Sequence, residues 1–347
     1  MKKITCSVVG ARGYSGIETA RLLLQHPNVR LTHCFATSDF ELGSFFGSAS
    51  LIEKANSVQC LPDSEILKNL TDVVFLATPA ETSLSLAPKI IAAGKKVIDL
   101  SGAFRLKNND YKKWYGFEHD NKDLLATAEY GLSPWAGPAG KTKLVANPGC
   151  YATAITMALA PLLKAGLIEE SSVVVDAKSG TSGAGKKASE NMLFTEVDGE
   201  CLPYKVGKHQ HYPEIVEALE MLTGKKVDLH LTTSLLPTRR GIIAGVYAKV
   251  KAGVSLDKVE SAFAESYHGY ALVRHGTVTK NPNLLSLKKV VGTGETHISY
   301  ELEGGRLYVF SCIDNLLKGA ASQAVENLNR IFDFPVSTGL TQLEALT

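Results

Sequence analysis

The sequence has no long apolar run and almost no excess of charge. No uninterrupted apolar stretch approaches the roughly 18 residues that span a bilayer. The 37 Lys and Arg residues nearly balance the 35 Asp and Glu residues, for a net charge of +2. Neither a membrane nor a nucleic-acid partner is therefore indicated. Internal repeats and low-complexity segments are also missing. These absences favour a globular protein whose partner is a small molecule.

The six cysteines include no C-x-x-C pair, so neither a structural zinc site nor a redox disulfide motif is expected, and we predict no bound metal. Three of them, Cys6, Cys34 and Cys312, lie in strand-like runs and are expected in the core. This usage is typical of a reducing compartment, so we expect a cytoplasmic protein.

A chain of 347 residues exceeds one ordinary core, so two domains are expected. The pattern predicts an α/β fold with a Rossmann-like dinucleotide-binding domain over residues 1–148 and 315–347. A catalytic and oligomerisation domain, α+β with a largely antiparallel sheet, is expected over residues 149–314. Two segments inside this plan, residues 230–235 and 241–251, alternate like antiparallel strands. Residues 107–141 are expected to form an ordered but irregular loop region.

A glycine-rich loop follows the first predicted strand. Its glycines have the spacing G-x-x-G-x-x-G, and a helix and a second strand, residues 29–36, come after them. This order is typical of dinucleotide binding, because glycines let the backbone approach a pyrophosphate and the helix N-terminus stabilises its charge. A tight turn without a ligand is the alternative. The candidate cofactor contacts in this loop are Gly10, Arg12, Gly13, Tyr14, Ser15 and Gly16.

The end of the second predicted strand bears on the choice between NAD and NADP. An acidic residue there would bind the ribose 2′-hydroxyl of NAD, but here Thr37 and Ser38 precede Asp39. Arg12 in the glycine loop can meet a 2′-phosphate. We therefore expect NADP(H), with Arg12 and Ser38 among its contacts, while Asp39 keeps NAD open.

The stretch around Cys150 carries the candidate nucleophile. Pro148 and Gly149 predict a sharp turn between a strand that ends at Ala146 and a helix that begins near Cys150. Free N–H groups and the dipole at a helix N-terminus lower the pKa of a thiol, and the thiolate is the nucleophile. The alternative is that Cys150 is a small buried apolar residue.

Two histidines, His209 and His211, precede another predicted helix. On an extended segment, residues i and i+2 point the same way, so both imidazoles can face one site. One hypothesis is a general base beside the Cys150 thiol. A second is an H-x-H metal pair with Glu214 as a third ligand, and a third is two surface imidazoles. The metal hypothesis lacks further ligands in the sequence, whereas the base hypothesis has a nucleophile in Cys150.

Two arginines lie in loops beside predicted strands. Arg105 follows a strand that ends at Leu100, and Arg240 lies between two strands. Each guanidinium can form a fork onto a carboxylate or a phosphate, and a solvated surface position is the alternative. A cluster of glycines and hydroxyls at residues 179–186 lacks the Walker A spacing but lets the backbone approach a ligand.

Six motifs together carry a resemblance to one family. They are residues 10–16, 101–105, 147–153, 179–186, 209–214 and 314–320, and they span nearly the whole chain. In this order they resemble the N-acetyl-γ-glutamyl-phosphate reductase family, within the semialdehyde dehydrogenase group. The combination of Asn-Pro-Gly-Cys-Tyr with Ser-Gly-Thr-Ser-Gly-Ala-Gly is specific, and aspartate-semialdehyde dehydrogenases differ around the cysteine and the histidines. One departure is Gln210, where relatives often have arginine.

The resemblance implies NADPH-dependent reduction of N-acetyl-L-glutamyl 5-phosphate to the 5-semialdehyde and phosphate, a step of arginine biosynthesis. It implies a thioester on Cys150 that hydride reduces to a hemithioacetal, and a homodimer or homotetramer. We expect His209 to be the acid/base and His211 to orient the site or bind a substrate carboxylate. The remaining candidates are Arg105, Arg240 and Asn147 for the substrate, and Gly183 and Asn315 for the nicotinamide end.

Other functions stay open at this point. A related acyl phosphate, aspartyl or N-acetyl-aminoadipyl phosphate, is an alternative substrate, because one methylene is worth only about 1–3 kcal/mol of discrimination. A cysteine–histidine hydrolase or transferase would use Cys150 without needing the glycine loop. A non-catalytic nucleotide-sensing protein would leave a reactive thiol unexplained.

Overall fold

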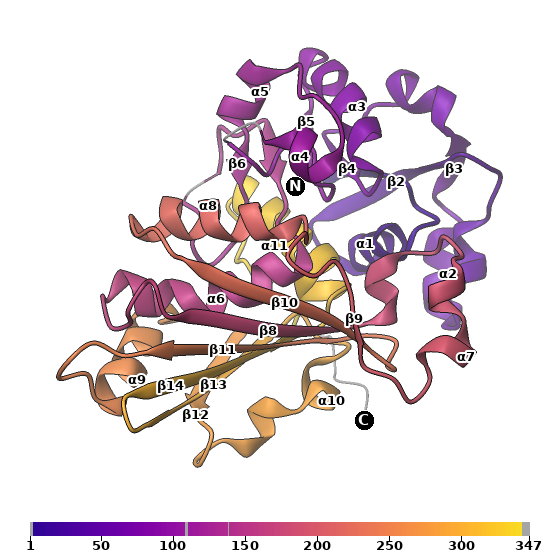
Figure 1. Ribbon diagram of the computed structural model, residues 1–347. Helices are drawn as coiled ribbons and strands as arrows, with labels where there is room; N and C mark the ends of the chain where they lie inside the picture. The colour runs from indigo at the N-terminus through magenta and orange to yellow at the C-terminus, as the bar shows by residue number, and fades with distance from the viewer. Residues whose placement is uncertain (1–2, 108–109, 138, 342–347) are drawn as a thin grey trace. The chain divides into compact units, whose positions relative to one another are not determined.

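The computed structural model describes residues 3–107, 110–137 and 139–341 (Figure 1). The chain forms two compact units. Among the described residues, the first unit runs to Pro148 and resumes at Ala320, and the second holds Gly149–Gly319. Each unit is built on one seven-stranded sheet. In the described ranges, no helix has the length and apolar character that crossing a bilayer requires.

The sheet of the first unit is parallel throughout, in the order β3-β2-β1-β4-β5-β7-β6. Parallel sheets are covered on both faces, and all four residues of its inner strand β4 are buried. The strands are β1 (Ile4–Val9), β2 (Val29–Ala36), β3 (Gln59–Pro62), β4 (Val73–Leu76), β5 (Lys96–Asp99), β6 (Glu129–Tyr130) and β7 (Leu144–Ala146).

The strand order reverses at β1, which pairs with β2 on one side and β4 on the other. Open parallel sheets bind ligands beyond the carboxyl ends of the strands at such a point. Gly10 directly follows β1, and its N–H donates to the carbonyl of Phe35 in β2. The fold therefore puts the glycine loop at the expected ligand position of the sheet.

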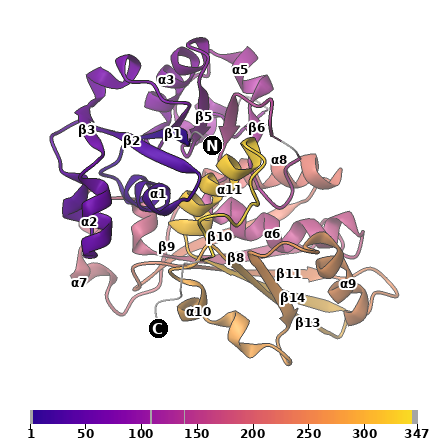
Figure 2. The same ribbon diagram turned by 180° about the vertical axis from the view of Figure 1, so that it is seen from behind.

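The last helix of the chain belongs to the first unit. It contacts α1 and β5, and Figure 2 shows it in yellow beside α1. All ten of its residues are buried, and the side-chain amides of Gln323 and Asn327 both donate to the carbonyl of Gly131. The helices of this unit are α1 (Tyr14–Gln25), α2 (Ala49–Ala55), α3 (Ala80–Ala92), α4 (Tyr111–Tyr115), α5 (Lys122–Thr127) and α11 (Ser322–Ile331).

The prediction of an irregular segment over residues 107–141 was wrong, because this segment contains α4, α5 and β6. Both helices are too short to be stable alone, so their local sequence gives little signal. Tertiary packing forms them: Tyr111 in α4 and Leu125 in α5 are buried in the core of the unit. Asn108, Asn109 and Pro138 lie outside the described residues.

The second unit has a mixed sheet in the order β12-β13-β14-β11-β8-β10-β9. Four of its six neighbouring pairs are antiparallel, as in the hairpin of β13 and β14, and two are parallel, so the prediction of a largely antiparallel sheet is confirmed. The strands are β8 (Val173–Gly180), β9 (Leu202–Pro203), β10 (Leu229–Leu236), β11 (Ile242–Lys249), β12 (Val273–Thr277), β13 (Thr296–Glu303) and β14 (Arg306–Ile313).

Strands β10 and β11 run in opposite directions but are not neighbours. β8 lies between them, parallel to β10 and antiparallel to β11. β8 also continues to Gly180, which pairs with Leu236, so the expected glycine and hydroxyl loop starts later than the sequence indicated. Alternation in a sequence shows that a strand has one buried face, but it does not show which strand is its partner.

Helix α6 (Cys150–Lys164) is the central helix of the second unit (Figure 1). It packs against β11, β14, α8 (His211–Thr223) and α9 (Leu256–Ser266). Every residue from Tyr151 to Leu163 is buried as a result, which explains why apolar side chains occur all around this helix. The short helices α7 (Phe194–Val197) and α10 (Leu287–Val290) complete the unit.

Candidate active site

Cys150 is the first residue of α6, and Gly149 is its N-cap residue. β7 ends at Ala146, so the chain passes from strand to helix within three residues, and Gly149 itself has an extended backbone, φ −69° and ψ 153°. The prediction of a thiol at a helix N-terminus is confirmed. Cys150 is partly exposed, whereas Cys6, Cys34 and Cys312 are buried in the core as expected.

His211 is the first residue of α8, and its imidazole lies over Gly149. A Cβ on Gly149 would stand 2.6 Å from Cε1 and 2.8 Å from Cδ2 of His211, and closer still to Nε2. Glu214, one turn along α8, accepts a hydrogen bond from the Gly149 N–H at 2.7 Å and is almost fully buried. Helix α8 therefore brings an imidazole and a carboxylate to the residue before Cys150.

His209 lies beside His211, with 4.8 Å between the ring centroids. The expected extended geometry was wrong, because Gln210 has helical angles, φ −62° and ψ −18°. The two rings still converge, since the turn brings the backbone N–H of His211 to Nδ1 of His209 at 3.1 Å. Both histidines are buried.

The environment of His209 favours the neutral imidazole. Burial, followed by the nearby His211 and Lys205, lowers its pKa to about 3. Because Nδ1 accepts a backbone hydrogen bond, the proton of the neutral ring is assigned to Nε2. Two tyrosine rings meet this imidazole edge-on, Tyr151 at 5.1 Å and Tyr204 at 5.7 Å between centroids. His209 is thus held as a neutral group between two tyrosine rings.

Arg240 forms a salt bridge with the buried carboxylate of Asp314, with Nε and Oδ2 3.0 Å apart, and 18% of its side chain stays exposed. The neighbouring Asn315 accepts from the Gly241 N–H at 2.8 Å and donates to the Ser182 hydroxyl at 3.0 Å. The loop of residues 181–184, which contains Gly183, is therefore tied to the end of β14.

Arg105 and Asn147 lie together in the first unit. Arg105 is 8% exposed, and its guanidinium donates to the carbonyls of Asn147 and Leu100, both at 2.8 Å. Asn147 is fully buried; its amide donates to the carbonyl of Ala320 and accepts from Asn327, both at 3.1 Å. These bonds fix the turn that leads to Cys150.

The glycine loop of the first unit leaves little room for side chains. Gly10 has φ +80°, and a Cβ there would stand 2.9 Å from the carbonyl carbon of Ala77. A Cβ on Gly16 would stand 2.9 Å from Cα of Ala11. Gly13 is the N-cap residue of α1, and no side chain caps this helix N-terminus. Tyr14 and Ser15 are the first residues of the helix. Because no side chain caps the N–H groups of this first turn, they fit a pyrophosphate.

Arg12 and Ser38 come together at the end of β2. The guanidinium of Arg12 donates a hydrogen bond to the hydroxyl of Ser38, and both side chains are exposed. Asp39 is also exposed. A cation and a hydroxyl side by side at this position are suited to a phosphate on the 2′-oxygen of a ribose.

Some residues of the second-unit cluster carried no clear signal in the sequence. The sequence suggested Glu214 only as a metal ligand. Glu214 follows His211 by three residues, and on a helix this spacing places two side chains next to each other. Tyr204 and Gly319 were missed, because strand pairing and a turn of the chain bring them to the cluster. In the part of the chain that the structure describes, no three His, Cys, Asp or Glu side chains are grouped as a metal site requires.

Comparisons with known proteins connect both units to one family. The semialdehyde dehydrogenase, NAD binding domain family matches residues 5–142, and the semialdehyde dehydrogenase, dimerisation domain family matches residues 150–315. An N-acetyl-gamma-glutamyl-phosphate reductase from Geobacillus sp. is 41% identical over 96% of this chain and 97% of its own length. The chain belongs to the N-acetyl-gamma-glutamyl-phosphate reductase family. The resemblance that the six motifs carried is confirmed.

Further relatives in the N-acetyl-gamma-glutamyl-phosphate reductase family agree. Those from Bacillus mycoides and Staphylococcus epidermidis are 39% and 37% identical over 97% and 96% of this chain, and 98% and 97% of their own lengths. Among solved structures, aspartate semialdehyde dehydrogenase II from Vibrio cholerae has a TM-score of 0.70 and 16% identity, covering 96% of this chain and 99% of its own. At this identity the likeness shows the fold alone, and the predicted fold class is confirmed.

Proposed function

We propose that the protein reduces N-acetyl-L-glutamyl 5-phosphate to N-acetyl-L-glutamate 5-semialdehyde and phosphate, with NADPH as the hydride donor, in arginine biosynthesis. The observation that carries the proposal is a partly exposed thiol at the N-terminus of α6, with His211 and Glu214 packed on its N-cap residue. Relatives that match nearly the whole length of this chain and bear the name of this activity support it. From the cysteine usage we place the enzyme in the cytoplasm.

Cys150 would act as the nucleophile. Its thiolate attacks the acyl carbon of the substrate, the bond to the phosphate oxygen breaks, and inorganic phosphate leaves a thioester on the sulfur. Backbone N–H groups at the start of α6 would donate to the oxygen that becomes negative in this step. The same donors stabilise that oxygen again when the thioester is reduced.

The first unit fits NADPH. The close packing at Gly10 and Gly16 and the uncapped start of α1 would hold the pyrophosphate, and Arg12 with Ser38 would hold the 2′-phosphate. Bound NADPH would supply the hydride that reduces the thioester to a hemithioacetal. In the second unit, Gly183 and Asn315 stay the candidates for the nicotinamide end, and the Asn315 amide donates to Ser182 beside Gly183.

We assign proton transfer to His211 instead of His209, which the sequence favoured. His211 contacts the residue next to the nucleophile, and Glu214 lies on the same helix beside it. His209 has a pKa of about 3, so its protonated form is scarce at neutral pH and cannot serve as a ready acid. His209 would then orient His211, because its Nδ1 holds the backbone N–H of His211.

The arginines would divide the remaining work. Arg240 keeps an exposed part beyond its salt bridge with Asp314, so it would bind the substrate's phosphate or carboxylate. Arg105 and Asn147 would support the turn before Cys150 and would not bind the substrate themselves. The Arg105 guanidinium and the Asn147 amide already donate hydrogen bonds to backbone carbonyls. The expectation of direct substrate contacts from these two is replaced by a supporting role.

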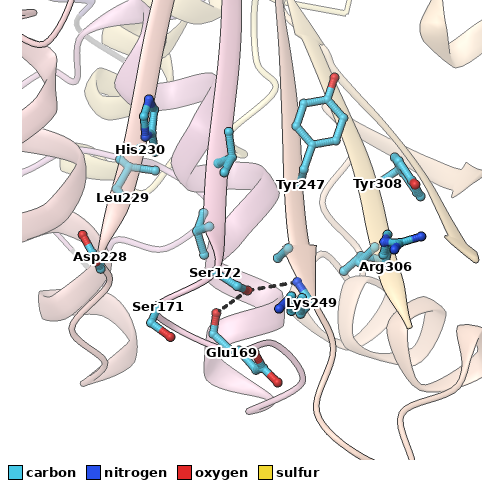
Figure 3. A pocket seen from close by; sticks show the side chains of 14 residues that line it. Glu169, Ser171, Ser172, Asp228, Leu229, His230, Tyr247, Lys249, Arg306 and Tyr308 are labelled. Atoms are coloured by element: carbon cyan, nitrogen blue, oxygen red, sulfur yellow. Dashed lines mark hydrogen bonds between the residues drawn. The ribbon is translucent and has the colours of Figure 1, made fainter. Parts of the chain in front are cut away.

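We also propose that a second copy of the chain packs on the sheet of the second unit. Tyr247, Tyr308 and Phe310 form an aromatic group on neighbouring strands of this sheet, and Val174 of β8 is 43% exposed. A cavity of about 700 Å³ opens there, with Tyr247, Tyr308 and Arg306 at its edge (Figure 3). The matching family is named for dimerisation, which favours a homodimer or a homotetramer of such pairs.

Reverse-direction NADPH formation tests the reaction and the substrate together. Enzyme, NADP and phosphate are mixed with N-acetylglutamate semialdehyde, aspartate semialdehyde or N-acetyl-aminoadipate semialdehyde, and absorbance is followed. We expect the highest kcat/KM with N-acetylglutamate semialdehyde. A preference for either other aldehyde would identify a related acyl phosphate as the substrate. No NADPH from any of them, with NADP bound, would indicate a nucleotide-sensing protein.

A further inference from the structure

A turn at the end of the second unit lies against the nucleophile. Gly319 belongs to a π-helical turn, Leu317–Ala321. A Cβ on Gly319 would stand 2.7 Å from Cβ and 3.2 Å from Cα of Cys150. The obstructing atoms belong to Cβ and the backbone, not to the flexible end of a side chain, so they cannot move away cheaply. The backbone of Gly319 therefore packs closely against Cβ of Cys150, the carbon that carries the thiol, and leaves no room for a side chain.

Asp314 builds this turn. It is fully buried, and its carbonyl accepts the N–H of Gly319 at 2.9 Å. Its carboxylate accepts from the guanidinium of Arg240 and from three backbone N–H groups, those of Leu316 (2.8 Å), Leu317 (3.1 Å) and Gly292 (2.9 Å). One buried carboxylate thus gathers the start of the turn, the Arg240 loop and the Gly292 loop.

Each contact has a consequence for Cys150. A buried carboxylate is stable only when donors surround it, and removing its charge leaves some of those donors unpaired. The turn would then relax, and Gly319 would no longer be fixed against Cys150. A π-helical turn is a rare and costly conformation that often occurs at functional sites. The turn therefore limits where Cα and Cβ of Cys150 can lie at the start of α6.

We propose that Gly319 and Asp314 are positioning residues for the Cys150 nucleophile. Gly319 fixes the place of the thiol by close approach, and Asp314 fixes the place of Gly319. The activity part of this inference rests on the proposed function, but the orientation of the thiol does not. It can be measured by alkylation of Cys150 with iodoacetamide, which needs neither substrate nor cofactor.

The first test uses Gly319→Ala. Alkylation of the Cys150 peptide is followed by mass spectrometry over a range of pH, so the exposed Cys201 does not interfere. We expect the midpoint of the alkylation profile to move to higher pH, because the displaced sulfur loses the N–H groups of α6. We expect kcat to fall by about 100-fold with KM changed by less than about threefold, since a shift of about 1 Å in a reacting group has this effect.

The matched control is Gly276→Ala in β12, where an added Cβ would also meet a neighbouring side chain, that of Asn281, but away from Cys150. This variant overpacks the protein at a site that does not touch Cys150. Its melting temperature can therefore drop, but its alkylation profile and kcat should stay at wild-type values. If Gly319→Ala matches Gly276→Ala in both readouts while folded, the proposal is wrong.

The second test uses Asp314→Asn, which keeps the shape of the side chain and removes its charge. As for Gly319→Ala, we expect the midpoint of the alkylation profile to move to higher pH and kcat to fall. The control is Asp257→Asn, at the exposed start of α9. A folded Asp314→Asn with an unchanged alkylation profile would overturn the role of Asp314. A wild-type enzyme with no turnover, but with the predicted alkylation shifts in the variants, would refute the proposed function and leave the positioning role intact.

Discussion

The imidazole of His211 covers Gly149, the residue before Cys150, so closely that a Cβ on Gly149 would stand 2.6 Å from its Cε1. The N–H of the same glycine donates to Glu214 at 2.7 Å. One helix, α8, therefore holds the N-cap of another, α6, through an imidazole and a carboxylate. The absence of a side chain at position 149 is what allows the imidazole to lie over the residue before Cys150.

Substitution of Gly149 by alanine should displace the His211 ring. We expect kcat to fall by about 100-fold, because the ring must move by about 1 Å or more to clear the new methyl group. Steady-state kinetics with far-UV circular dichroism check the result. Gly47→Ala is the control, since a Cβ there meets no atom within 4 Å. A folded Gly149→Ala enzyme with wild-type kcat would contradict the assignment of His211.

Substitutions of His211 and His209 should have different effects on kcat and on its pH dependence. His211→Gln removes the group that transfers the proton, so kcat should drop by about 10²–10⁴-fold and lose its dependence on a titrating group. His209→Gln removes a neutral orienting ring, so a smaller loss with a retained pH profile is expected. The measurement is kcat against pH for both variants. The reverse order of effects would restore His209 as the acid/base.

His209 should make the stability of the fold depend on pH. The unfolded chain takes up a proton on this ring near pH 6.5, whereas the folded protein resists protonation until about pH 3. Between these values the unfolded state binds more protons, so the free energy of unfolding should fall as pH falls, by up to about 1.4 kcal/mol per pH unit. Urea denaturation of wild type and His209→Gln at about pH 7 and about pH 5 checks this. We expect the variant to lose less stability than wild type over that interval; equal losses would show that His209 is not held neutral.

Arg12 should set the preference for NADPH over NADH. Arg12→Ala removes the cation that lies beside Ser38, so KM for NADPH should rise about tenfold, which corresponds to about 1.4 kcal/mol. KM for NADH should change little. Arg21→Ala, which alters an ion pair with Glu18 on α1, is the control. An equal rise of KM for both cofactors would mean that Arg12 supports the loop without contacting a 2′-phosphate.

Local features of the fold followed from the sequence because short-range chemistry decides them. Pro148 and Gly149 predict the turn that puts Cys150 at a helix N-terminus, and the structure has that turn. The strand, glycine loop, helix and strand order around Gly10 likewise matches β1, α1 and β2. In both cases the backbone preferences of a few neighbouring residues contain the information.

The arrangement of the site depended on contacts between distant residues. Nothing in the sequence near His211 indicates that its ring covers Gly149, because the contact arises from the packing of α8 on α6. Two other features also depend on contacts between distant residues. They are the placement of β8 between β10 and β11 and the close packing of Gly319 against Cys150. Periodicity reveals which face of an element is buried, whereas the partner of that face is fixed only by the whole fold.

Trapping the acyl group on Cys150 tests the thioester route. Enzyme, NADP and N-acetylglutamate semialdehyde are mixed without phosphate, quenched in acid and analysed by peptide mass spectrometry. We predict one N-acetylglutamyl group on the peptide that contains Cys150, its loss when phosphate is added before the quench, and no adduct in Cys150→Ser. NADPH formation that proceeds without phosphate, with no acyl group on Cys150 at any time, would contradict the thioester route.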